Sequence, residues 1–219
     1  GPFSERKSSL VGSPNLSGWI GKPLKTDIEN EFDTSVYIEN DSAVVALGEA
    51  VYGAGKGFEI VSYITVSTGV GGARIVGGRI DEKSIGFEPG HQIIDADKSM
   101  CNNCDGNYLG NYISGKGLIN RFGVSPVDIK DEKVWDEELP KYLAYGLNNT
   151  IVHWSPDVVV LGGSMITGNP SISIESTKKY LQDVLKIFPN LPEIKKAKLG
   201  DIGGLYGAIA YLKQNVKKV

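Results

Sequence analysis

The stretch FEIVSYITVSTGVGGARIVGGRI, residues 58–80, decides the fold class. It holds two runs rich in Val, Ile and Tyr on either side of a glycine-rich turn, a pattern typical of a β-hairpin. The turn places Thr68 beside Gly69, and backbone amides in such a turn can point at phosphate oxygens. No Gly-Lys-Ser/Thr follows, so the turn is not a Walker A loop. On the residues alone, a phosphate-binding turn and a plain glycine hairpin both stay open.

Segments on either side of this hairpin alternate between strand and helix patterns. The predicted strands outside the hairpin cover residues 35–40 and 155–163, and the second is a buried run ending at Gly162 and Gly163. The predicted helices cover residues 25–32, 40–52, 107–123, 134–154, 176–188 and 205–216. Residues 201–208, DIGGLYGA, imitate a phosphate loop but lead straight into the last helix, so we interpret them as the start of that helix. The alternation predicts an α/β fold.

Composition excludes several classes of function. Charged residues make up 22% of the 219 residues and the formal net charge is -3, so no basic excess indicates a nucleic-acid partner. No signal segment opens the chain, and no apolar run approaches the ~20 residues that span a bilayer. The sequence therefore predicts a cytoplasmic protein with no membrane partner. Two cysteines do not make a disulfide scaffold, and in a reducing compartment we expect free thiols or metal ligands.

Asn40 and Asp41 lie between a predicted strand and the predicted helix that follows it. Asp41 could therefore cap the helix or act as a base at the strand's end, and the cap is the commoner role. Two roles are likewise open for Gly162 and Gly163. Paired glycines can simply turn a strand into a helix, yet strand ends are where α/β folds bind ligands.

Residues 86–106 hold the other polar candidates. Glu88 and His91 flank a Pro-Gly turn, so both side chains can face one pocket and hydrogen-bond a polyol, although such a pair is often structural. His91, Cys101 and Cys104 offer three soft ligands, whereas a structural zinc site takes four. A redox Cys-x-x-Cys is less favoured, because no helix visibly starts at Cys101 to lower its pKa.

In their order along the chain, these stretches resemble the ROK family of bacterial sugar kinases and sugar-responsive repressors. SPNLSGWIGKPL resembles the family's Pro-Asn-Leu segment, VYIENDSAVVALGEAVYGAGKG its Asn-Asp segment and VSTGVGGARIVGGRI its second phosphate loop. FEPGH resembles Glu-x-Gly-His, PDVVVLGGSM the adenosine-side strand and loop, and LGDIGGLYGAIAYL the closing helix. The resemblance implies a two-lobed, ribonuclease H-like, actin-like ATPase fold. Residues 57–204 would form the large lobe, and residues 1–56 with 205–219 a remnant of the small one.

The resemblance also implies residue roles. The parent protein would use ATP and Mg²⁺ to phosphorylate a hexose hydroxyl, with Asp41 as general base. Asn40, Asp41, Glu88 and His91 would hold the sugar. Thr68 and Gly69 would lie near the ATP phosphates, and Gly162 and Gly163 beside the adenosine. The family commonly forms homodimers.

The family's first phosphate loop, Asp-x-Gly-Gly/Ala-Thr, has no counterpart in this sequence. We therefore expect a C-terminal fragment that has no kinase activity alone. An alternative parent is a ROK repressor, whose helix-turn-helix would precede this region. A third is an assembly subunit without chemistry, although the retained Asn40, Asp41, Glu88 and His91 argue against it.

Many family members bind a structural zinc through His and three Cys in the loop after Glu-x-Gly-His. Here Cys101 falls on the first cysteine position, whereas Cys104 comes one residue late and Tyr108 occupies the third. Gly110 occupies the position of a sugar-touching glutamate. The resemblance thus implies that this sequence keeps only part of the family's zinc loop, namely His91, Cys101 and Cys104. Without zinc, His91 would need another partner, and we expect Asp95 or Asp97.

Overall fold

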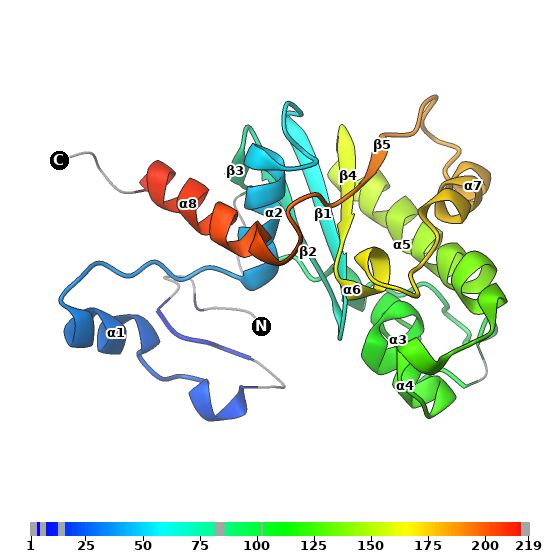
Figure 1. Ribbon diagram of the computed structural model, residues 1–219, viewed down its shortest axis with the longest axis horizontal. Coiled ribbons are helices and arrows are strands. Elements are labelled where there is room, and N and C mark those ends of the chain that lie inside the picture. The colour runs from blue at the N-terminus through cyan, green and yellow to red at the C-terminus, as the bar shows by residue number, and fades with distance from the viewer. Residues whose placement is uncertain (1–3, 5–7, 13–15, 82–85, 102, 216–219) are drawn as a thin grey trace.

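A computed structural model describes residue 4 and residues 8–12, 16–81, 86–101 and 103–215. Its centre is a mixed sheet of five strands in the order β3-β2-β1-β4-β5 (Figure 1). The strands are β1 (Ile60–Val66), β2 (Val70–Val76), β3 (Arg79–Ile80), β4 (Val158–Gly162) and β5 (Glu193–Lys196). Neighbours β1, β2 and β3 are antiparallel, whereas β4 runs parallel to both β1 and β5. The predicted hairpin and α/β class are confirmed.

Alternating side chains on the central strands separate two cores. Val61 and Tyr63 of β1 face a core shared with α2 (Asp41–Tyr52) and α8 (Gly203–Asn215). Ile64 and Val66 face the larger core on the other side, under α5 (Leu139–Trp154) and α7 (Ile174–Val184). Figure 1 shows these helix pairs on opposite faces of the sheet. Because successive side chains of a strand point to opposite faces, a strand covered on both faces buries nearly all of them, as β4 does with its run VVVLG.

The helices α2 and α8 cross at close range. A Cβ at Gly207 would overlap with the carbonyl oxygen of Val44, and one at Gly48 would overlap with that of Gly203. Glycine at both positions lets the two backbones approach, which side chains would prevent. This crossing fixes the N-terminus of α2 relative to the sheet.

The remaining helices lie at the ends of the sheet or apart from it. They are α1 (Leu24–Phe32), α3 (Leu109–Ile113), α4 (Gly115–Phe122) and α6 (Ser164–Thr167), with single turns at Ser17–Trp19, Pro89–His91, Pro126–Asp128 and Gly200–Ile202. A π-helical turn, Val134–Glu138, leads into α5. No helix in the described residues is both long and apolar enough to cross a bilayer. The helix start expected at residues 201–208 is confirmed.

One predicted strand is absent from the described residues, and one observed strand was not predicted. Residues 35–40 are irregular in the structure, because no strand lies beside them; Tyr37 instead packs on Tyr211 of α8, with ring centroids 6.2 Å apart. The short edge strand β5 was not predicted, since only Ile194 of its four residues is buried. The division of the chain at residue 57 stays a prediction.

Candidate functional site

Asn40 and Asp41 open α2, and the structure separates their roles. Asn40 is the N-cap, because its Oδ1 accepts a hydrogen bond from the Ala43 amide at 3.1 Å. Asp41 is the first helical residue, and its Oδ1 accepts from the Ser42 amide at 2.7 Å. Of the two roles left open for Asp41, the cap, which is the commoner one, is therefore not the one that it has in this structure. Its exposed carboxylate keeps Oδ2 without a hydrogen bond to any described residue.

Glu88 and His91 flank Pro89 and Gly90, as predicted, and His91 is the last residue of the single turn Pro89–His91. Their Oε2 and Nδ1 atoms lie 3.6 Å apart, and both side chains are exposed. The His91 ring stacks on Tyr108 with centroids 5.1 Å apart. His91 therefore takes Glu88 and Tyr108 as partners, and the expectation of Asp95 or Asp97 in that role is wrong.

The candidate sugar site has two parts, the start of α2 and the Glu88–His91 turn, and both pack against the first residues of β2. A Cβ at Gly71 would come within 2.6 Å of Ser42 Oγ, so glycine lets the start of α2 sit against the strand. A Cβ at Gly90 would overlap with the carbonyl oxygen of Val70, so the Glu88–His91 turn also lies directly on β2. Ser42, which follows Asp41, and the Glu88–His91 turn thus lie against adjacent residues, Gly71 and Val70, at the start of β2.

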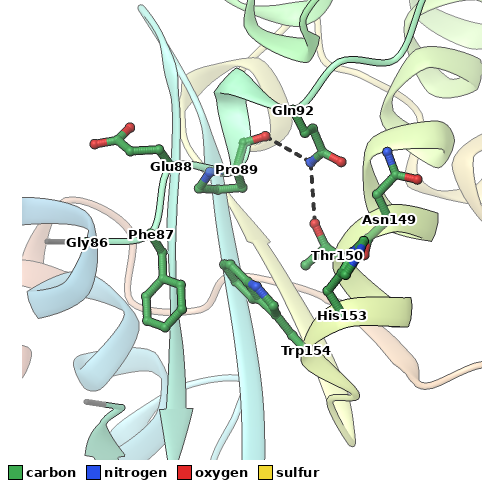
Figure 2. A pocket seen from close by; sticks show the side chains of 9 residues that line it. All are labelled: Gly86, Phe87, Glu88, Pro89, Gln92, Asn149, Thr150, His153 and Trp154. Carbon is green, nitrogen blue, oxygen red and sulfur yellow. Dashed lines mark hydrogen bonds between the residues drawn. The ribbon is translucent and has the colours of Figure 1, made fainter. Parts of the chain in front are cut away.

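A cavity lies between the Glu88–His91 turn and α5. It has a volume of about 330 Å³ and lies on one face of the helix (Figure 2). Gln92 Nε2 donates to the Pro89 carbonyl oxygen at 2.8 Å, and Phe87 packs on Trp154 with ring centroids 4.9 Å apart. Figure 2 shows Glu88 pointing away from this aromatic pair. His153 also lines the cavity, and its Nδ1 lies 2.7 Å from the Asn149 carbonyl oxygen.

The loop that resembles a zinc loop is held by Asp95. This buried carboxylate accepts from the Tyr112 hydroxyl at 2.6 Å and from the Ser99 and Met100 amides, both at 3.0 Å. Burial acts to raise the pKa of Asp95, but these hydrogen bonds outweigh it and hold the pKa below its ordinary value. Tyr142 extends the network by donating to the Met100 carbonyl oxygen at 2.9 Å. Sequence reasoning missed this network, because nothing in the local pattern around Asp95 marks it as buried.

Cys101 and Cys104 form a disulfide, which corrects the expectation of free thiols or metal ligands. Sulfur atoms bonded to each other cannot act as the thiolate ligands that zinc takes. No group of three or more His, Cys, Asp or Glu residues in the described part of the chain is arranged to hold a metal ion. The residues His91, Cys101 and Cys104 therefore do not fit a zinc site in this structure.

A cavity of about 500 Å³ lies beside the hairpin turn, between α4 and α6. Its lining mixes polar and apolar side chains. The polar ones are Ser67, Thr68, Lys116, Ser125, Ser164 and Asn169, and the large apolar ones are Ile119, Val127, Trp135 and Met165. Most ligand pockets have volumes of about 300–1,000 Å³ and apolar walls with a few polar groups. The volume and the mixed lining of this cavity are therefore those of a ligand pocket. No carboxylate lines the described cavity, so it supplies no typical ligand for Mg²⁺.

Of the four predicted nucleotide residues, Thr68 lines this cavity directly. Gly69, Gly162 and Gly163 are not among its lining residues. Gly163 has a φ of +86°, and a Cβ there would overlap with the Val66 carbonyl oxygen, so the turn after β4 needs glycine. That turn places Ser164 and Met165, the next two residues, in the cavity wall.

Comparison with known proteins decides the family. The model of the ROK family matches residues 1–215. The chain belongs to the ROK family. The N-acetyl-D-glucosamine kinase of Escherichia coli O6:H1 is 30% identical over 93% of this ROK chain and 75% of the kinase. The xylose repressor of Bacillus subtilis is 25% identical over 90% of this chain and 55% of the repressor.

Among solved structures, the ROK hexokinase from Thermus thermophilus superposes with a TM-score of 0.78 at 28% identity. The match covers 98% of this chain and 77% of the hexokinase. The expected ribonuclease H-like, actin-like fold of the ROK family is thereby confirmed. This ROK chain spans about three quarters of the length of these kinases and about half the length of the repressor.

Proposed function

We propose that this chain is the sugar-binding and nucleotide-binding part of an ATP-dependent hexose kinase. The observation that supports it best is the placement of two sites along one short segment. Thr68 lines the apolar cavity, while Val70 and Gly71 lie against the Glu88–His91 turn and the start of α2. A kinase must hold its phosphoryl donor and acceptor side by side, since positioning dominates phosphoryl transfer.

Asp41 is proposed to take the proton from the sugar hydroxyl. The sugar oxygen then bonds to the γ-phosphorus of ATP while the bond between that phosphorus and the β,γ-bridging oxygen breaks, and ADP leaves. The Ser42 amide fixes Oδ1, which leaves Oδ2 to face the hydroxyl. The Oδ1 atom of Asn40 accepts the capping hydrogen bond from the Ala43 amide. Its amide nitrogen is therefore the group proposed to donate to a sugar oxygen. A general base contributes about 10²–10⁴-fold to such a reaction.

Hexose titration by calorimetry on the full-length protein tests the proposal. We expect a hexose to bind, and His91→Ala to weaken binding, because His91 is proposed to hold sugar hydroxyls. Gln92→Ala removes the hydrogen bond from Gln92 Nε2 to the Pro89 carbonyl oxygen behind the turn. We expect it to weaken hexose binding less than His91→Ala does. Failure of every hexose to bind would contradict the proposal.

A second candidate function is the sugar-sensing domain of a ROK repressor, favoured by the match with the xylose repressor over most of this chain. A repressor would bind sugar without releasing ADP from ATP. The sequence upstream of this chain also separates the two, because a helix-turn-helix before the family's first phosphate loop predicts a repressor.

A further inference from the structure

Lys116 is the single charged side chain among the described residues that line the 500 Å³ cavity. It lies in the first turn of α4, and its side chain is exposed. No ion pair joins it to a carboxylate in the described part of the chain. A cation without a protein counter-charge at the rim of a ligand-sized cavity favours an anionic ligand.

The backbone amides at the start of α4 are already occupied. Gly115 N donates to the Ser67 carbonyl oxygen at 2.8 Å, and Lys116 N donates to the Thr68 carbonyl oxygen at 3.1 Å. Gly117 N donates to Ser114 Oγ at 3.0 Å. These bonds dock α4 on the hairpin turn, so the helix N-terminus has no such amide left for a phosphate. The positive charge that meets a ligand here must come from the Lys116 side chain.

We propose that Lys116 binds the polyphosphate of the nucleotide and so favours a nucleoside triphosphate over the bare nucleoside. The inference rests on the proposed function, because it assumes that this cavity takes ATP. Lys116 lines the cavity together with Ser67 and Ser164, whose Oγ atoms lie 3.1 Å apart. The bonds from Gly115 N and Lys116 N to the Ser67 and Thr68 carbonyl oxygens bring the start of α4 to this part of the lining. Lysine suits this role, since its compact charge on a flexible stem can follow a phosphate chain.

The test compares ATP and adenosine binding to the full-length protein by calorimetry. The variants are Lys116→Gln, Lys116→Arg and the matched control Lys179→Gln, an exposed lysine of α7 outside the cavity. We expect Lys116→Gln to weaken ATP binding about tenfold, as the loss of one charge-assisted contact would, and to leave adenosine binding unchanged. Lys116→Arg should recover most of the loss, and Lys179→Gln should bind as the wild type does.

Salt dependence gives an independent reading. Raising ionic strength from about 0.05 M to about 0.5 M shortens the screening length, so wild-type ATP affinity should fall more steeply than that of Lys116→Gln. Equal ATP affinity in wild type and Lys116→Gln would overturn this proposal alone. Equal losses of ATP and adenosine binding would overturn it as well. A wild type that binds neither ligand would overturn the proposed function together with it.

Discussion

Asp95 is the residue on which the loop beside the candidate sugar site depends. Its two oxygens accept from three donors that belong to that loop and to α3. These hydrogen bonds make Asp95 the side chain around which this loop is arranged. A carboxylate held by several donors in a buried site is costly to neutralise.

Asp95→Asn should therefore lower the Tm by several degrees at neutral pH, because the amide nitrogen cannot accept from the donors. Asp97→Asn is the matched control, since the exposed Asp97 accepts one bond, from the Ser99 amide at 3.2 Å. We expect a smaller shift for it. Thermal unfolding followed by circular dichroism measures both, and equal shifts would contradict the role given to Asp95.

The pH dependence of this effect has a definite sign. The folded state holds the pKa of Asp95 below its ordinary value, which is near 4. The ionised carboxylate therefore adds stability above that pH and loses it as the pH falls through the lowered pKa. The Tm difference between wild type and Asp95→Asn should be steady near neutral pH and narrow below about pH 4. A difference that widens in acid would refute this account.

At the scale of elements, the crossing of α2 and α8 is the contact most exposed to a single substitution. Gly207→Ala would place a methyl group on the Val44 carbonyl oxygen. Overpacking of this kind costs about 1–3 kcal/mol, so we expect a lower urea midpoint. The sheet should be retained.

Gly204→Ala on the same helix is the matched control. The nearest atom to a Cβ there is Val45 Cγ2 at 3.9 Å, an ordinary contact. Alanine is the better helix former by about 0.8–1 kcal/mol, so this variant should be as stable as the wild type or slightly more so. If Gly204→Ala were destabilised as much as Gly207→Ala, close packing would not be the cause.

Local pattern predicted the elements whose formation depends on their own residues. The hairpin of β1 and β2 follows from its turn, and α2 from the Asn-Asp pair at its start, although which of the two residues is the cap came only from the structure. Strand pairing between distant segments is not written in local pattern, which is why residues 35–40 were wrongly predicted as a strand and β5 was missed. The Asp95 network and the cysteine pairing were missed for the same reason, since each depends on the folded loop.

In the candidate site, too, the residues set by local sequence could be predicted, and those set by contacts between distant segments could not. The Glu88–His91 pair and Thr68 could be placed from short motifs, because each lies in or beside a turn with its own signature. Lys116 could not, because only the docking of α4 on the hairpin turn brings it to the cavity. The roles of the sugar-site residues stay predictions.

At the scale of the whole molecule, α8 leaves an apolar stripe exposed. Leu205, Ile209 and Leu212 are 67%, 47% and 45% exposed, at a spacing that puts them near one another on the helix. Exposed apolar patches of this kind mark interaction surfaces or promote aggregation. The matched kinases extend beyond the length of this chain, and the longer protein is expected to cover this stripe.

The 219-residue chain alone should therefore self-associate as its concentration rises. Sedimentation velocity at two concentrations measures this. Leu205→Lys combined with Ile209→Lys should suppress it, whereas Ile187→Lys, at an equally apolar exposed position after α7, should not. Association that is unchanged in the double variant would contradict a role for the stripe.

The most direct test of the central claim is hexose-dependent release of ADP from ATP by the full-length protein, measured for wild type and Asp41→Asn. We predict turnover with at least one hexose, and a rate lower by about 10²–10⁴-fold in the variant, with no measurable turnover by the 219-residue chain alone. Turnover by Asp41→Asn at the wild-type rate, or a full-length protein that releases no ADP with any hexose, would contradict the account.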